Sequence, residues 1–423
     1  METLSLLIEY LIQLINIVTV VISLYYLILS LFSIYIKRRR KVKNLERSFA
    51  ILIPAHNEAN VIKNTVESCN NLDYDRDKFD VFVVADNCSD NTGTIAKNAG
   101  ASVLEPETTS ESGKAWVLEW FFHKLFKMPK KYDSVLILDA DNLIHPDFLK
   151  AINDKMNEGY EVVQGYLDSK NPFDSITTAF NSLEFWMTDR LGKLSRDNVG
   201  LSSQLGGTGF AVETHILEKF GWDPDCLAED LEFTCKLCLN GYKVGWAHDA
   251  KIYDEKPLTL KQSLRQRTRW MQGYADVFSK YFFKLMGKAI KTRSFVMADC
   301  AIYTLQPVIF IMIGIRWGGA FLFDLIEFLQ NGSGSLTRSI SGGSYIFGLL
   351  VIGIYLIQTL LVPIVLKMDG KLNIKTIVTY LLYPLYSATW VPVAFVGMIN
   401  KDKKEWVHTE HTRAISHEEI DFK

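Results

Sequence analysis

Between residues 49 and 167 the sequence alternates short apolar runs with stretches of helical composition, and no other feature restricts the fold as strongly. The apolar runs have the length of strands: Phe49–Ile53, Val81–Ala85, Ser134–Leu138 and Val162–Tyr166. The helical stretches lie between them: Glu58–Asn71, Thr92–Ala99 and Lys114–Phe126. Such alternation predicts an α/β domain with a doubly wound, mostly parallel sheet. Ligands of such sheets bind at the carboxyl ends of the strands, so polar residues there are candidates for a site.

An apolar stretch, Leu4–Ile36, precedes this domain and is longer than the roughly 20 residues that span a bilayer. No basic residue precedes it and no small-residue cleavage site follows, so we do not expect a signal peptide. The basic cluster Lys37–Lys41 follows at once and favours the cytoplasmic side. We therefore expect a transmembrane helix with its N-terminus outside and the chain from residue 41 onward in the cytoplasm.

Three further apolar segments occupy the C-terminal part: Ala298–Phe328, Tyr345–Leu366 and Thr376–Ile399. Lysines flank the last of them on both sides, which places both of its ends in the cytoplasm. Pro384 and Pro392 interrupt it. These features favour a bent or re-entrant pair of helices on an α-helical transmembrane base. A full crossing, the alternative, would put the C-terminal tail outside.

Apolar residues recur at helical spacing across 264–285, opposite a basic face, which indicates an amphipathic helix, or two in succession, at the membrane surface. The net charge of −2 gives no global basic field, so no nucleic-acid partner is expected. Cys235 and Cys238 have the spacing of half a zinc site, but no second pair follows, and we interpret them as packed thiols.

Two carboxylates, Asp139 and Asp141, close the predicted strand Ser134–Leu138. Alternate residues of an extended chain point the same way, so both can approach one hard cation such as Mg²⁺. Such an ion can neutralise a diphosphate leaving group. Either carboxylate could instead cap the helix expected near His145-Pro146.

Two other acidic positions allow both a functional and a structural interpretation. Asp86 ends the predicted strand Val81–Ala85 and could accept hydrogen bonds from a base or a ribose, or cap the helix that starts near Thr92. Asp230 opens a helical run, where the helix dipole should keep it ionised. That would suit a general base acting on an acceptor hydroxyl, although a cap is the alternative.

An arginine and a tryptophan are adjacent in Gln266-Arg267-Thr268-Arg269-Trp270, within the amphipathic stretch. The planar guanidinium of Arg269 can pair with phosphate. The indole of Trp270 offers a flat face to a sugar and an N–H donor. Such a pair on an amphipathic helix can also be an interfacial anchor.

These elements occur in the order of a known family: Pro54-Ala55-His56-Asn57-Glu58, Asp86, Gly113-Lys114, Asp139-Ala140-Asp141, Ala228-Glu229-Asp230 and the Gln-x-x-Arg-Trp motif. Over about residues 49–280 the chain resembles the membrane-embedded, processive family 2 glycosyltransferases, which include cellulose, chitin, hyaluronan and poly-N-acetylglucosamine synthases. The resemblance implies a GT-A-type fold. Ala228 departs from the threonine usual in the family.

The resemblance also implies roles for individual residues. Asp86 would contact uracil, Lys114 the nucleotide, and Asp139 with Asp141 the sugar diphosphate and Mg²⁺ or Mn²⁺. Asp230 would be the catalytic base, with Glu229 beside it at the substrate. The remaining implied substrate-binding residues line the diphosphate and acceptor sites or belong to an acceptor-side loop and a gating loop: Gln266, Arg269, Trp270, Gly207, Thr208 and Trp406.

The implied reaction is an inverting transfer that polymerises a β-linked polysaccharide from UDP-glucose or, as the next choice, UDP-N-acetylglucosamine. The growing chain would leave through the enzyme's own transmembrane channel, with a possible accessory membrane subunit. The alternative is a non-processive transferase acting on a membrane lipid. A pure transporter and a catalytically inactive scaffold are less compatible with the retained motifs.

The predicted organisation has five parts. They are a transmembrane helix with a basic stop (1–40), a cytoplasmic GT-A domain (41–260), interface helices (261–293), transmembrane or re-entrant helices (294–400) and a cytoplasmic tail (401–423). This arrangement describes a multi-pass protein of the plasma membrane, in contact with the lipid bilayer.

Overall fold

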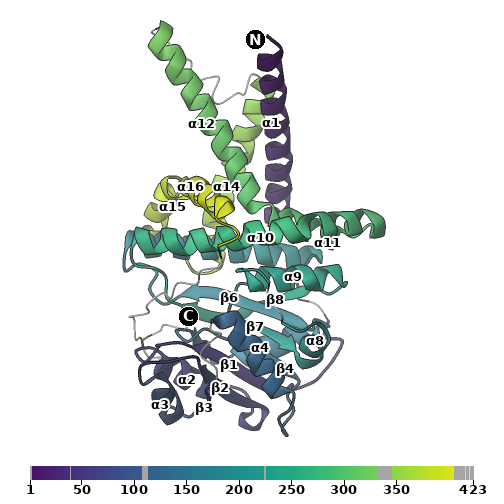
Figure 1. The fold of residues 1–423 in the computed structure, drawn as a ribbon, viewed down its shortest axis with the longest axis vertical. Helices are drawn as coiled ribbons and strands as arrows, with labels where there is room; N and C mark the ends of the chain where they lie inside the picture. The colour runs from purple at the N-terminus through teal and green to yellow at the C-terminus, as the bar shows by residue number, and fades with distance from the viewer. Residues whose placement is uncertain are drawn as a thin grey trace.

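The computed structural model describes residues 2–38, 40–106, 113–222, 225–331 and 345–403, together with Ile415 and Glu419. An α/β domain lies below a layer of helices, and three helices rise from that layer: α1 (Glu2–Leu31), α12 (Gln306–Asn331) and α14 (Tyr345–Met368) (Figure 1). The predicted residue Trp406 lies outside the described residues.

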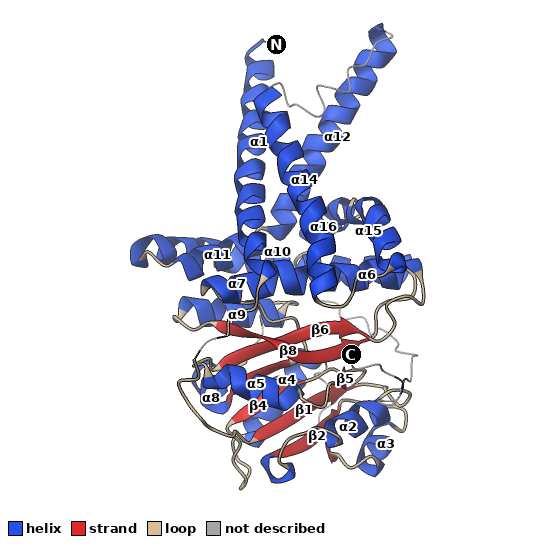
Figure 2. Ribbon diagram, turned by 180° about the vertical axis from the view of Figure 1, so that it is seen from behind, coloured by secondary structure: helices blue, strands red, loops and turns tan. Residues whose placement is uncertain are grey.

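One eight-stranded sheet forms the centre of the α/β domain, with the order β3-β2-β1-β4-β7-β6-β8-β5 (Figure 2). Its strands are β1 (Phe49–Ala55), β2 (Phe79–Ala85), β3 (Ser102–Leu104), β4 (Ser134–Ile137), β5 (Leu143–Ile144), β6 (Val162–Ser169), β7 (Phe210–Glu213) and β8 (Val244–Asp254). Strands β7 and β5 pair antiparallel with their neighbours, and the other pairings are parallel. The predicted mostly parallel sheet is confirmed.

The four predicted strands correspond to β1, β2, β4 and β6. The three predicted helices correspond to α2 (Ile62–Asn70), α3 (Thr92–Asn98) and α4 (Lys114–Leu125). Further helices of the domain are α5 (Phe148–Asn157), α8 (Thr214–Phe220) and α9 (Glu229–Leu239).

The two faces of the sheet carry separate hydrophobic cores, as a doubly wound sheet requires. Along β1, Ile51 and Ile53 pack with residues of α2 and α5, whereas Ala50 and Leu52 pack with residues of α4, α8 and α9. All four side chains are fully buried. Successive residues of a strand point to opposite faces, so a continuous apolar run is what a strand covered on both sides needs.

The helix layer consists of α6 (Ile176–Met187), a π-helical segment (Thr188–Leu194), α7 (Ser195–Val199), α10 (Leu260–Thr292), α11 (Phe295–Thr304), α15 (Ile374–Ser387) and α16 (Trp390–Ile399). The predicted amphipathic stretch is one helix, α10, of 33 residues. Thr259 and Gln262 form a capping box at its start. Arg293, with φ +54°, ends it and turns the chain into α11.

Among the described residues, one helical segment, Gln13–Ile34, is long and apolar enough to cross a membrane, with a mean hydropathy of 2.4. Two bent pairs pass the same test jointly: Phe295–Thr304 with Gln306–Arg316, at 54°, and Ile374–Ser387 with Trp390–Ile399, at 41°. The second pair has the bend predicted for 376–399. The first divides the segment predicted at 298–328, because α12 starts anew at Gln306 and places Pro307 in its first turn, where proline is tolerated.

Buried ion pairs join helices of the layer to one another, to the segment that follows α14 and, through this segment, to the sheet. Arg196 Nε lies 2.8 Å from Asp299 Oδ2, and both side chains are 2% exposed. Tyr25 of α1 donates to the same carboxylate at 2.6 Å. On the other side, Asp369 contacts Arg190, and Lys371 Nζ lies 2.5 Å from Asp168 Oδ2. Charged partners thus connect the sheet, the helix layer and the segment that follows α14.

Helix α10 is packed closely on two sides through glycines. A Cβ at Gly273 would lie 2.7 Å from both the backbone N and the Cβ of Ala228, just before α9. A Cβ at Gly397 of α16 would lie 2.6 Å from Met271 Cβ. Real Cβ atoms do not approach this closely, so both contacts of α10 depend on the missing side chain.

Gly273→Ala is expected to destabilise the protein by about 1–3 kcal/mol, because the added methyl group meets backbone that cannot rotate away. Gly287, on the same helix, has no atom within 4 Å of the place that a Cβ would occupy. Gly287→Ala should therefore be neutral or stabilise by up to about 1 kcal/mol. The apparent melting temperatures of the two variants in detergent check this, and equal shifts would contradict the close packing at Ala228.

Candidate active site

A cavity of about 750 Å³ lies between the sheet and the helix layer. Every predicted site residue that the structure describes lines it: Asp86, Lys114, Asp139, Asp141, Gly207, Thr208, Glu229, Asp230, Gln266, Arg269 and Trp270. Residues far apart in the sequence therefore meet in one place, as the resemblance implied.

The topology explains this convergence. Asp86 follows β2, and Asp139 follows β4 after one further residue, so both lie at the carboxyl edge of parallel strands. Strand β7 runs the opposite way, so its beginning lies at the same edge. Gly207 and Thr208 lie just before this beginning, separated from it by Gly209, and Thr208 Oγ1 accepts a hydrogen bond of 2.9 Å from Asp139 N.

Asp86 is 3% exposed, and backbone and side-chain donors fix its carboxylate. Oδ2 accepts from Gly113 N at 2.9 Å, and Oδ1 accepts from Asn87 Nδ2 at 2.8 Å. Asp86 does not cap α3, because Asp90 Oδ1 accepts from Thr92 N at 3.0 Å there. The capping alternative for Asp86 is therefore excluded.

Lys114 connects three parts of the cavity. Its Nζ contacts Asp139 Oδ1 and donates to Gly207 O at 2.7 Å. Burial opposes its charge, but the carboxylates of Asp139 and Glu229 outweigh that effect and raise the pKa of Lys114. A cation is thus held where phosphate oxygens can bind.

Asp139 and Asp141 do not cap the next helix, since α5 begins only at Phe148. Asp141 is 5% exposed and its Oδ2 accepts from Glu255 N at 3.0 Å, while the Asp139 side chain is 38% exposed. The described residues contain no group of three or more His, Cys, Asp or Glu side chains able to hold a metal. Two carboxylates suit Mg²⁺ or Mn²⁺ when phosphate oxygens complete the coordination.

Glu229 and Asp230 form the first turn of α9, after Ala228 at the N-cap. Asp230 Oδ1 accepts from Leu231 N at 2.7 Å. Burial, and next the charge of Asp230, raise the pKa of Glu229 to about 7, and burial also raises the pKa of Asp230. Burial thus opposes the effect that the helix dipole is expected to have on the ionisation of Asp230.

Helix α10 supplies Gln266, Arg269 and Trp270 along the top of the cavity. The Trp270 ring meets Phe185 edge to face, with 6.0 Å between ring centroids. The charge of Arg269 lowers the pKa of Glu229, so the guanidinium acts electrostatically on that carboxylate. The cavity therefore brings an acidic edge, several cations including Lys114 and Arg269, and an indole together.

A family model described as "Glycosyltransferase like family 2" matches residues 46–273, which is more than half of the chain. The chain belongs to glycosyltransferase family 2. It is a glycosyltransferase, and the cavity at the carboxyl edge is its candidate active site.

Curated relatives of this family 2 glycosyltransferase include the probable glycosyltransferase YdaM of Bacillus subtilis (strain 168), 27% identical over 88% of this chain and 89% of the relative. The poly-beta-1,6-N-acetyl-D-glucosamine synthase of Staphylococcus aureus (strain MSSA476) is 26% identical over 58% of each chain. The chain thus spans little more than half of that synthase.

Among solved structures, the mannosyltransferase PcManGT from Pyrobaculum calidifontis, in complex with GDP-Man and Mn²⁺, is similar to this glycosyltransferase. The TM-score is 0.59 at 17% identity, over 94% of this chain and 99% of that one. This likeness supports the GT-A-like fold, including the helices outside the α/β domain.

Several cavity residues of the glycosyltransferase were not predicted. Lys256 is 2% exposed, lies 2.8 Å from Asp254 Oδ1, and places its Nζ 3.1 Å from the Phe185 ring centroid. Burial raises the pKa of Glu184 to about 7. Aromatic residues of the helices complete the wall: Tyr274, Tyr303, Phe310 and Trp390. Among these aromatic residues, only Tyr274 could have been predicted from the sequence, because it follows Trp270 by four residues and therefore lies on the same face of one helix.

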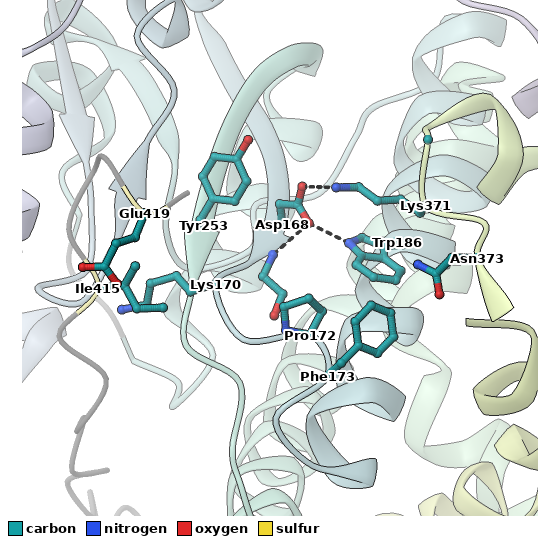
Figure 3. A pocket seen from close by; sticks show the side chains of 12 residues that line it. Asp168, Lys170, Pro172, Phe173, Trp186, Tyr253, Lys371, Asn373, Ile415 and Glu419 are labelled. Atoms are coloured by element: carbon teal, nitrogen blue, oxygen red, sulfur yellow. Dashed lines mark hydrogen bonds and ion pairs between the residues drawn. The ribbon is translucent and has the colours of Figure 1, made fainter. Parts of the chain in front are cut away.

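A second cavity of the glycosyltransferase, of about 500 Å³, lies at the end of β6 (Figure 3). Asp168 lines this cavity, accepts a hydrogen bond from Trp186 Nε1 at 2.8 Å and pairs with Lys371. Ile415 of the tail also lines it, packs on Leu143 and Tyr253, and accepts from Asn64 Nδ2 at 2.9 Å. Because these polar groups bind one another, we interpret this cavity as a junction between elements.

Proposed function

We propose that the protein is an inverting transferase that polymerises a β-linked polysaccharide from a UDP-sugar, with UDP-glucose and then UDP-N-acetylglucosamine as the donors to test. The observation that carries this proposal is the single cavity in which Asp86, the Asp139–Asp141 pair, Asp230 and Trp270 meet. The groups that we propose to bind the nucleotide, the metal and the phosphates and to stack on the sugar all line this one cavity.

In the proposed mechanism, Asp86 accepts hydrogen bonds from the uracil, while Lys114 and Arg269 hold the diphosphate. Mg²⁺ or Mn²⁺, when bound at Asp139 and Asp141, supplies positive charge that neutralises the leaving group. Gln266 and Glu229 contact the substrate beside them.

The acceptor sugar stacks on Trp270, with Gly207 and Thr208 forming the backbone loop beneath it. Asp230 takes the proton of the attacking hydroxyl, whose oxygen forms the new bond to the anomeric carbon as the bond to the diphosphate breaks. One displacement inverts that carbon, so no covalent intermediate is required. Burial raises the pKa of Asp230, and a carboxylate with a higher pKa is a stronger base.

The location of the enzyme belongs to the same proposal. The segment Gln13–Ile34 and the two bent pairs are apolar enough to anchor the helix layer in a plasma membrane, with the active site in the cytoplasm. Trp390, from the start of α16, lines the cavity, so a growing chain could pass directly from the active site to these helices. Trp406 in the tail and an accessory membrane subunit complete the proposed arrangement.

A non-processive transferase acting on a membrane lipid is the second candidate. It is favoured by one observation: the wall of the cavity contains Phe310 and Trp390, whose rings stack at 5.4 Å and which belong to the two bent apolar pairs. An acceptor carried by a lipid could reach Asp230 along that wall.

Incubating the purified full-length protein with one labelled UDP-sugar at a time tests the proposal. We expect UDP release with UDP-glucose or UDP-N-acetylglucosamine, and a large product on a gel that a β-linkage-specific hydrolase digests. A small product extracted into organic solvent would favour the lipid acceptor. Absence of UDP release with every UDP-sugar, in the presence of Mg²⁺ and Mn²⁺, would overturn both candidates.

A further inference from the structure

Two tyrosine hydroxyls meet in the active-site cavity, Tyr274 of α10 and Tyr303 of α11, with 3.1 Å between their oxygens. Both residues line the same cavity as Asp230. Neither belongs to a motif on which the proposed mechanism depends.

The pair lies against the turn that carries the proposed base. Tyr274 and Tyr303 belong to the hydrophobic cluster that contains Ala228 and Leu231, on either side of Glu229-Asp230. Tyr274 also packs in the cluster that contains Met271 and Trp390, together with Trp270. A sugar that stacks on Trp270 with one hydroxyl at Asp230 would therefore meet these phenols.

One of the two tyrosine hydroxyl protons remains available to a ligand. Each phenol has one O–H proton, and one of the two hydroxyls donates to the other. Over the described ranges of the chain, this contact is the only hydrogen bond made by either hydroxyl. The second proton is therefore available to an oxygen atom that enters the cavity. Burial, and next the charges of Tyr303 and Asp230, raise the pKa of Tyr274 well above its usual range, so it stays protonated.

The ring of Tyr303 packs against a guanidinium that a buried ion pair fixes in place. The guanidinium of Arg196 lies 5.3 Å from the centroid of its ring and is fixed by the buried pair with Asp299. Tyr25 of α1 donates to Asp299 at 2.6 Å. A donor fixed in this way can orient a sugar, because little motion is lost when the sugar binds.

We propose that the Tyr274–Tyr303 pair orients the acceptor sugar by donating to an oxygen next to the attacking hydroxyl, and so selects which hydroxyl faces Asp230. The acceptor is a hexose with several hydroxyl groups of similar reactivity. The pair is thus a positioning element that sets the linkage of the product. This inference rests on the proposed function.

Tyr274→Phe and Tyr303→Phe test the proposal, because Phe keeps the ring and removes only the hydroxyl. We expect each variant to bind UDP as the wild type does, while the fraction of product with another linkage rises about tenfold. The double variant should add little to either single one, because the two hydroxyls act as a unit. Methylation analysis of the product measures the linkages, and calorimetry measures UDP binding.

Tyr281→Phe is the matched control. Tyr281 lies on α10 outside the cavity, and its hydroxyl donates to Glu232 Oε1 at 2.9 Å. Its loss should leave the linkage unchanged. A wild-type linkage in both cavity variants would overturn the proposal, even if their rates fell, and so would an equal change in Tyr281→Phe. A wild-type protein that transfers no sugar would instead overturn the proposed function itself.

Discussion

Asp230→Asn is expected to lower the turnover of sugar transfer by about a hundredfold or more, because a hydroxyl group is too weak an acid to attack without a base. Asn has nearly the shape of Asp and can still accept the hydrogen bond that Asp230 Oδ1 receives from Leu231 N. Loss of the negative charge from the first turn of α9 should lower the stability of the protein by at most about 1 kcal/mol. Turnover and the dissociation constant of the UDP-sugar, measured on one preparation, separate these effects.

Glu229→Gln provides the comparison. Its carboxylate is also partly buried and feels the charge of Lys114, but in the proposed mechanism it contacts substrate and takes no proton. It should lose less turnover than Asp230→Asn. Near-normal turnover in Asp230→Asn, with strong loss in Glu229→Gln, would transfer the role of base to Glu229.

Asp141→Asn is expected to abolish measurable transfer at ordinary Mg²⁺ or Mn²⁺ concentrations, a loss of at least about a hundredfold. The change removes one of the two charges available to a hard cation. Asn keeps an oxygen that can accept from Glu255 N, so folding should persist. Titration of transfer activity with Mn²⁺ measures the effect, and excess chelator should reproduce it in the wild type.

Asp147→Asn is the control for that change. Asp147 precedes α5, its side chain is 57% exposed, and it does not line the cavity. Its activity and metal dependence should match the wild type. Transfer that continues in Asp141→Asn, or in the wild type with excess chelator, would exclude the metal assignment.

Four strands, β1, β2, β4 and β6, were predictable because their signal is local. These strands are largely buried on both faces, so apolar residues predominate in β1, β2 and β4, whereas β6 also buries Gln164 and Asp168. The parallel strands β3 and β8 were not predicted, because β3 has three residues and polar residues interrupt β8. Strand β7 was not predicted, because it has only four residues and follows a glycine-rich loop. Strand β5 has two residues, fewer than any periodicity can reveal.

The site could be predicted where its residues follow strands or open helices, since the chain then fixes their place at the carboxyl edge. Asp86, Asp139 and Asp230 are of this kind. Tyr303 and Trp390 could not be predicted, because they come from segments whose apolar composition indicates only a membrane environment. They reach the cavity through the packing of α11 and α16 on α10. At α16 this packing depends on Gly397, which leaves no periodic signal.

The buried ion pairs at the junctions have a consequence for dividing the chain. Removing α11 and the segments after it would leave Arg196 without Asp299, Arg190 without Asp369 and Asp168 without Lys371. Breaking a buried pair costs about 3–5 kcal/mol, and the whole free energy of unfolding of a protein is about 5–15 kcal/mol. A fragment that ends after β8 would therefore lose much of its stability. The α/β domain and the helices that follow it fold as one unit and must be expressed together.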